Sequence, residues 1–241
     1  MSSSGSKAIV KPSTRSLVIN GLSVIVGSWG LSNITRLVLP ASLAGASHKQ
    51  FLTNISVVAT LISNVCNIFN YFVQRCGQSS ALAGFSNFFS RDVALPVALV
   101  LETVVPLVYW PLRLFAMHLI MQEVPDGASP IPVPVDVSVH LLPFVFLFSD
   151  HFLSGTGRKF KISNGQAWFL VTFLGLSYYK WLEYLIDPST GQKYPYPFLD
   201  APEPYKSVIF VCVSSVAWCF YVLYQKFPPK TSEPTSTAKK D

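Results

Sequence analysis

Two side chains in this sequence have the chemistry for nucleophilic attack, Thr53 and His140. His140 lies in the apolar run 137–148, which is of the kind that crosses a bilayer. An ionisable group is costly to keep in such a run, so it marks a candidate functional site. A hydroxyl and an imidazole at one depth are the minimum set for acyl transfer, with the histidine removing the hydroxyl proton. The alternative for His140 is a hydrogen bond that joins two helices.

Four more polar residues fall in or beside apolar runs. Asp136 lies one helical turn before His140 and either orients the imidazole or caps its own helix. Lys180 and Glu183 share a helix face, where Lys180 could stabilise an oxyanion or simply pair with Glu183. Glu102 lies deeper in the membrane. It either supports the functional site or forms a hydrogen bond to a neighbouring helix.

The composition predicts an integral membrane protein. The 241 residues are 50% hydrophobic and 12% charged with a mean hydropathy of +0.41, whereas soluble domains carry roughly 25% charged residues. The net charge of +6 comes from basic residues between the apolar runs, so it indicates topology rather than nucleic-acid binding.

The apolar runs predict an all-α, polytopic bundle of six transmembrane helices. By length and scarcity of charge, the spans cover about residues 17–34, 51–73, 93–115, 133–152, 167–185 and 207–224. They form one membrane domain, residues 16–226, between a disordered basic tail, 1–15, and a second disordered tail, 227–241. A cleaved signal peptide is the alternative for the first span.

Basic residues set the expected orientation. With six spans, twelve Lys and Arg residues fall on the side of the termini and five on the other, with Lys180 inside the fifth span. The positive-inside rule then places both termini in the cytosol. Thr53 then lies in the first turn of its span at the outer face, and His140 lies about 8 Å in from the same face. Pro143 cannot donate to the carbonyl of Val139, which predicts a kink beside His140.

No cofactor is expected. Cys66, Cys76, Cys212 and Cys219 have no zinc or disulfide spacing, which favours a role as small packing residues. No glycine-rich phosphate loop is visible in the sequence.

Three short motifs resemble the androgen-induced membrane protein family. They are Phe51-Leu52-Thr53, the histidine followed by Leu-Leu-Pro-Phe at 140–144, and the stretch from Trp181 to Tyr196-Pro197-Phe198-Leu199. The likeness covers about residues 45–224 in the same order and spacing. It implies an intramembrane threonine hydrolase that cleaves fatty acid esters of hydroxy fatty acids, with Thr53 as nucleophile and His140 as its partner. The segment 135–139 departs from the family's Leu-Asn-His pattern, and the loop 187–204 is longer, which puts the support of the imidazole and the exact substrate in doubt.

Two other functions remain open from the sequence. A lipid or small-solute transporter would need a polar relay across the whole bilayer, whereas the ionisable groups thin out on the cytosolic half. A non-enzymatic scaffold or receptor would use the loop 187–204 to bind a partner. The expected partner is a membrane lipid substrate, protein partners are unknown, and the location is the endoplasmic reticulum or the plasma membrane.

Overall fold

The computed structural model describes residues 12–77, 79–121 and 131–230, and within these ranges the chain forms helices and no strand. The predicted all-α class is therefore confirmed. The six predicted spans correspond to the long helices α1 (Thr14–Ile34), α3 (Leu52–Arg75), α5 (Leu95–Phe115), α6 (Val133–His140) with α7 (Leu142–Phe152), α8 (Asn164–Leu185) and α9 (Tyr205–Lys226).

Short helices complete the fold. A π-helical stretch, η2, joins α4 to α5, so the third span is the second half of one continuous helical segment. The remaining elements are short turns at the ends of the long helices. The short elements are α2 (Ala41–Ala44), η1 (Ser47–Gln50), α4 (Ser80–Phe88), η2 (Phe89–Ala94), η3 (Met117–Leu119), η4 (Pro188–Thr190) and η5 (Pro197–Asp200).

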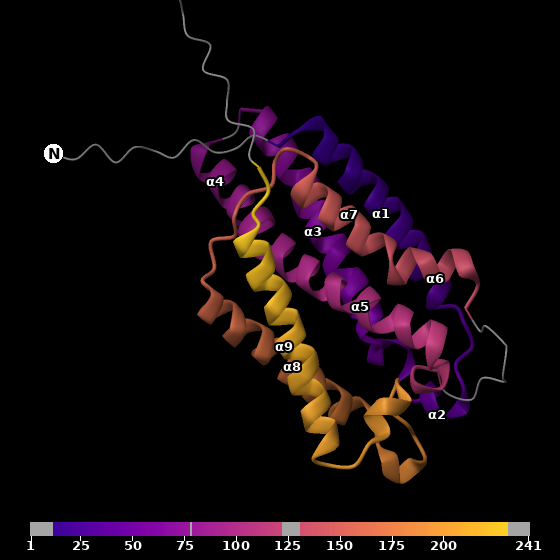
Figure 1. Cartoon of the computed structure of the whole chain (residues 1–241). Helices are drawn as coiled ribbons and strands as arrows, with labels where there is room; N and C mark the ends of the chain where they lie inside the picture. The colour runs from indigo at the N-terminus through magenta and orange to yellow at the C-terminus, as the bar shows by residue number, and fades with distance from the viewer. Residues whose placement is uncertain (1–11, 78, 122–130, 231–241) are drawn as a thin grey trace, which may run out of the picture.

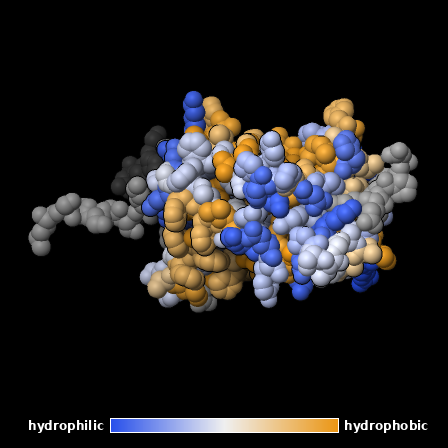
Figure 2. Space-filling view, turned by 90° about the horizontal axis from the view of Figure 1, so that it is seen from below, coloured by the Kyte–Doolittle hydropathy of each residue, from blue (hydrophilic) through white to orange (hydrophobic). Residues whose placement is uncertain are grey.

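The helices pack around α3 and α5. Helix α1 packs on α3, α6 and α7, while α5 contacts α3, α7 and α9. Helix α8 packs along α9 at the side of the bundle (Figure 1). We call the end that carries α2, η4 and η5 the loop end, and the opposite end, toward α4 and the end of α9, the tail end. Figure 2 views the molecule from below, where hydrophilic residues gather at the centre with apolar residues at the margins.

The protein is a multi-pass membrane protein. Five helical segments in the described ranges are long and apolar enough to cross a bilayer: Thr14–Ile34, Leu52–Arg75, Ser80–Phe115, Val133–Phe152 and Tyr205–Lys226. Helix α8 is not among them, although it has 22 residues and exposes Trp168, Phe169, Phe173 and Leu176. The count of six spans, with both termini cytosolic, requires α8 as a further span and stays a prediction.

The first helix is part of the bundle. Ser13 caps α1 by accepting a hydrogen bond from the backbone N–H of Ser16. Gly27 and Gly30 face the neighbouring helices and allow close packing. Of the two tails expected to be disordered, residues 1–11 and 231–241 lie outside the described residues, while α1 already begins at Thr14.

Polar groups do not thin out toward the tail end, and this part of the sequence analysis was wrong. Arg91, expected in a loop, is buried in η2 and forms an ion pair of 2.6 Å with Asp150 of α7. Its guanidinium also donates to Ser16 of α1. A buried arginine needs such partners because an unpaired charge in the interior is costly. The count of basic residues between the predicted spans did not show that Arg91 is buried, because the π-helical stretch turns its side chain inward.

The cysteines lie mostly on the surface. Cys76, Cys212 and Cys219 are exposed and Cys66 is half-buried. The predicted role as small packing residues within the chain therefore fits Cys66 but not the three exposed cysteines.

Candidate active site

Thr53 lies in the first turn of α3, where the chain turns from the extended residue Phe51 into the helix. Its side chain is 8% exposed and belongs to the wall of an internal cavity. The Ser56 hydroxyl donates to the Thr53 carbonyl at 2.9 Å, which helps to hold this first turn. Thr53 is therefore part of the wall that a ligand in this cavity would contact, as a nucleophile requires.

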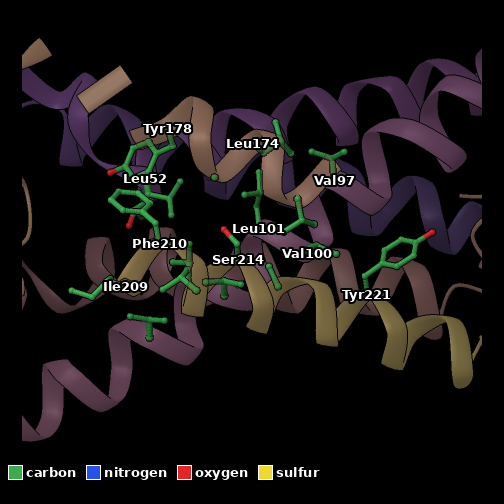
Figure 3. Close-up of a pocket in the computed structure, with 18 of the residues that line it drawn as sticks. Leu52, Val97, Val100, Leu101, Leu174, Tyr178, Ile209, Phe210, Ser214 and Tyr221 are labelled. Carbon is green, nitrogen blue, oxygen red and sulfur yellow. The ribbon is translucent and has the colours of Figure 1, made fainter. Parts of the chain in front are cut away.

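The cavity has a volume of about 170 Å³ and lies between α5, α8 and α9 (Figure 3). Aliphatic and aromatic side chains make most of its wall, including Val100, Leu101 and Leu174. At the loop end it is closed by residues of η5 and by the start of α3. A space of this kind suits a hydrocarbon chain and excludes water.

Tyr196 is a polar neighbour of Thr53 that comes from a loop. Its phenol lies close to the Thr53 side chain and to the backbone of Leu52 and Thr53. Its ring stacks on Phe198 with centroids 5.4 Å apart and contacts the edge of Phe51. Burial raises the pKa of Tyr196, and the hydrogen bonds from Thr53 offset part of that rise. The phenol therefore keeps its proton at neutral pH and can donate it.

His140 and Asp136 form a buried pair in α6. The Nδ1 atom of His140 lies 2.8 Å from Oδ1 of Asp136, and this carboxylate also accepts from Tyr109 Oη at 2.6 Å. Arg113 lies 3.4 Å from Oδ2. The N-cap of α6 is Pro132, so the alternative role of Asp136 as the helix cap was wrong. Asp136 instead receives three donors and orients the imidazole.

The backbone beside His140 is broken as predicted. Helix α6 ends at His140 and α7 begins at Leu142, with Pro143 in its first turn. Helix α6 starts at Val133, as the predicted span 133–152 does, because prolines fit the first turn of a helix, where the N–H groups have no helical partner. The indole of Trp110 donates to the carbonyl of His140 at 3.2 Å.

Tyr109 connects His140 to the cavity. Its ring stacks face to face on the imidazole, with centroids 3.5 Å apart and an interplanar angle of 3°. Tyr109 and Thr53 both line the cavity, whereas His140 lies behind this wall and is 5% exposed. Within the part of the chain that the structure describes, the Nε2 atom of His140 makes no hydrogen bond. This nitrogen is the one left to accept a proton.

Glu102 contacts α3 one to two turns beyond Thr53. It is fully buried in α5, accepts a hydrogen bond from Thr60 Oγ1 at 3.2 Å and lies close to the Ser56 hydroxyl, three residues after Thr53. This contact matches the alternative role of Glu102 as a link between helices.

Lys180 and Glu183 pair with each other on the outer side of α8. Their side chains lie 2.7 Å apart and are 73% and 37% exposed. The residues that line the cavity include Gly175 and Tyr178 of α8 but neither member of this pair. The structure thus brings together Asp136 with His140 and, separately, Lys180 with Glu183.

Comparison with known proteins decides the family. The family model described as FAR-17a/AIG1-like protein matches residues 29–228, which include Thr53, Tyr109, Asp136, His140 and Tyr196. This chain belongs to the FAR-17a/AIG1-like family. The resemblance to androgen-induced membrane proteins is thereby confirmed.

Two fungal relatives agree with this membership. The chain is 52% identical to the "UPF0641 membrane protein YHR140W" of Saccharomyces cerevisiae over 91% of its own length and 92% of the relative. It is 29% identical to the "UPF0641 membrane protein PJ4664.05" of Schizosaccharomyces pombe over 76% of each chain. No solved structure matches the chain significantly.

Three side chains of this FAR-17a/AIG1-like site were missed by the sequence analysis. Tyr109 and Arg113 come from α5, and Tyr196 comes from the segment before η5. The i, i+4 spacing of Tyr109 and Arg113 was visible as one helix face, but nothing in the sequence linked that face to Asp136. Tyr196 stood in a motif of the resemblance without an assigned role.

Proposed function

We propose that this protein is an intramembrane hydrolase that cleaves the ester bond of fatty acid esters of hydroxy fatty acids or related lipid esters. The observation that carries the proposal is that Thr53 lines the same apolar cavity as Tyr109, the tyrosine on which His140 stacks. Membership of the family is compatible with this activity.

In the proposed reaction, Thr53 Oγ1 attacks the carbonyl carbon of the ester while Nε2 of His140 accepts the hydroxyl proton. The tetrahedral intermediate collapses, the ester C–O bond breaks, and the imidazolium returns the proton to the leaving alkoxide. Water then attacks the carbonyl carbon of the acyl-threonine while His140 removes a proton from the water. The fatty acid leaves, and the imidazolium returns this proton to the Thr53 oxygen.

Neighbouring groups would support these steps. Asp136 holds Nδ1 of the imidazole and stabilises the positive charge that forms on it. The Tyr196 phenol, beside Thr53, is a suitable donor to the developing oxyanion. We assign no catalytic step to the exposed Lys180 or Glu183.

The site also suits its substrate class. A lipid ester with two long acyl chains lies in the hydrocarbon, and moving it into water costs about 0.8 kcal/mol per CH₂. A cavity inside the membrane domain receives the ester where it already is. With both termini in the cytosol, the site would lie beneath the outer or lumenal face, of the plasma membrane or the endoplasmic reticulum respectively.

The test is hydrolysis of branched fatty acid esters by the purified protein in detergent or in liposomes. Thr53→Ala and His140→Ala should each lower kcat at least a hundredfold. Thr53→Ser keeps a hydroxyl and should retain part of the wild-type kcat. A fluorophosphonate, which phosphonylates a reactive hydroxyl with loss of fluoride, should label the wild type at Thr53 and should not label Thr53→Ala.

Two control variants remove the same groups elsewhere. Thr35→Ala removes an exposed hydroxyl at the end of α1, and His118→Ala removes an imidazole from η3. Both should hydrolyse the esters at the wild-type rate. Full activity in folded Thr53→Ala would refute the threonine mechanism.

One observation favours a transporter as the second candidate. Buried polar side chains continue along α1 and α3 to the tail end, where Asn64 donates to Ser23 and Asn67 to Asn20. These bonds also fasten the two helices together, which is the simpler role. Proton-coupled lipid uptake into liposomes that survives Thr53→Ala and is lost in Glu102→Gln would favour transport over hydrolysis.

A further inference from the structure

The cavity reaches far beyond Thr53. Figure 3 shows Leu52, Tyr178 and Phe210 at one end, and Tyr221 at the other. Along α9 the wall runs from Ile209 to Tyr221, twelve residues or about 18 Å by helix rise. Such a length is more than half of the roughly 30 Å hydrocarbon core of a bilayer.

The far end of the cavity has a fixed stop. The Tyr221 hydroxyl donates to the carbonyl of Ile162 at 2.6 Å and accepts from the Gln225 amide at 2.9 Å. The ring also stacks on Phe160 with centroids 5.6 Å apart. A side chain held at both its ring and its hydroxyl cannot swing aside at little cost, so Tyr221 limits the depth of the cavity.

Helices α8 and α9 approach each other closely partway along the cavity. Gly175 of α8 and Ser214 of α9 both line it, and a Cβ atom at position 175 would come within 2.4 Å of Ser214 Oγ. Ser214 lies five residues beyond Ile209, or about 7.5 Å from the Thr53 end. The glycine leaves room here that a larger residue would fill.

We propose that this cavity is a measuring tunnel for one unbranched acyl chain, with Tyr221 setting the longest chain accepted. The wall beyond Thr53 is mostly apolar, with the Ser214 hydroxyl as a polar group partway along, so it favours a linear hydrocarbon over a strongly polar or branched group. The assignment of the chain as the acyl half of an ester rests on the proposed function, and the hydroxylated half would then stay outside the tunnel.

The depth gives an expected length. An extended chain advances roughly 1.2 Å per bond, a third of the 3.3 to 3.6 Å spanned by one three-bond residue. By helix rise, the depth to Ser214 holds about 6 bonds, the depth to Ala217 about 10, and the depth to Tyr221 about 15. Acyl groups near the last length should be the best substrates, and longer ones should be rejected.

Substitutions at two depths test the tunnel. Ser214→Leu should plug it near Thr53, and Ala217→Leu should plug it farther in. With a series of esters of graded acyl length, kcat/KM for the longest good substrate should fall at least tenfold in both variants. The length cut-off should move to about 6 bonds in Ser214→Leu and about 10 in Ala217→Leu. Val211→Leu is the matched control, because Val211 is 65% exposed on α9 and should leave the cut-off unchanged.

A binding measurement separates the tunnel from the chemistry. Retention of radiolabelled unbranched fatty acids of graded length is measured on the Thr53→Ala protein, alone and combined with each plug. A length cut-off that shifts with the plugs, without any ester hydrolysis by the wild type, would keep the tunnel and refute the hydrolase. Hydrolysis whose length profile ignores both plugs would refute the tunnel and keep the hydrolase.

A variant that fails to fold is replaced by another at the same depth. Leu174→Phe enlarges a wall residue next to Gly175, and should shift the cut-off as Ser214→Leu does. Melting temperature in detergent identifies folded variants. Wild-type binding that does not depend on chain length would overturn the proposal outright.

Discussion

Replacing Asp136 with Asn tests whether this carboxylate fixes the protonation of His140. All three of its neighbours are donors: Nδ1 of His140 and Oη of Tyr109 approach Oδ1, and Arg113 approaches Oδ2. An asparagine has one acceptor oxygen and one NH₂ group. If the NH₂ faces Arg113, two donors meet. If it faces His140, Nδ1 must become the acceptor and the proton moves to Nε2, which can then no longer accept one from Thr53.

The expected loss follows from these two orientations. Losing a hydrogen bond to a charged partner costs about 1.5 to 3 kcal/mol, which corresponds to roughly 10- to 150-fold in rate. The wrong tautomer costs more, since the same change in a Ser-His-Asp triad lowers kcat about 10⁴-fold. We therefore expect kcat of Asp136→Asn to fall by about 10 to 10⁴, with KM nearly unchanged because Asp136 does not line the cavity.

The assay is steady-state hydrolysis of a lipid ester together with thermal unfolding of each variant. Tyr109→Phe is the matched comparison, because it removes one donor from Asp136 and keeps the ring that stacks on His140. Tyr109→Phe leaves the bond between Nδ1 of His140 and Asp136 in place, so kcat should fall less than in Asp136→Asn, by no more than the roughly 10- to 150-fold of one hydrogen bond to a charged partner. The exposed Asp187 supplies a control, and Asp187→Asn should behave as the wild type.

A folded Asp136→Asn protein with wild-type kcat would refute the reasoning. A fall in kcat that only tracks the loss of folded protein would show that the carboxylate supports the bundle and not the imidazole.

Two further predictions concern stability. Asp150→Ala leaves the buried Arg91 charge unpaired and should destabilise the protein by about 3 to 5 kcal/mol, whereas the double variant Arg91→Met/Asp150→Leu should recover most of the loss in a denaturation experiment. Gly30→Leu should lower stability by about 1 to 3 kcal/mol and reduce activity, because even its Cβ would come within 2.3 Å of Ser138 Oγ in α6. A side chain added at position 21 meets open space, so Gly21→Leu should change neither stability nor activity. Thermal unfolding and the ester assay measure the two.

Local sequence patterns predicted the helices well. The apolar runs match α1, α3, α5 to α7 and α9 because a bilayer forces the backbone to satisfy its own hydrogen bonds over about 20 residues. Pro143 predicted the break after His140 for a similar local reason, since proline lacks the N–H that a continuous helix needs. The shared face of Asp136 and His140 followed from helix periodicity alone.

Burial was predicted less well. Arg91 was expected beside the membrane because charge is rarely buried, and the sequence does not show that Asp150 lies opposite it. For Lys180 the sequence left open an oxyanion role and an ion pair with Glu183, and the structure has the ion pair, exposed on α8.

The sequence by itself determined a polytopic helical membrane protein of the FAR-17a/AIG1-like family, with a hydroxyl and an imidazole as its candidate reactive groups. Only the tertiary structure placed Tyr109 against His140, brought Tyr196 to Thr53 and opened an apolar cavity between α5, α8 and α9. The reason is physical. Helix periodicity depends on neighbours within a few residues, whereas these contacts join segments far apart in the chain and depend on how side chains of different helices fill space together.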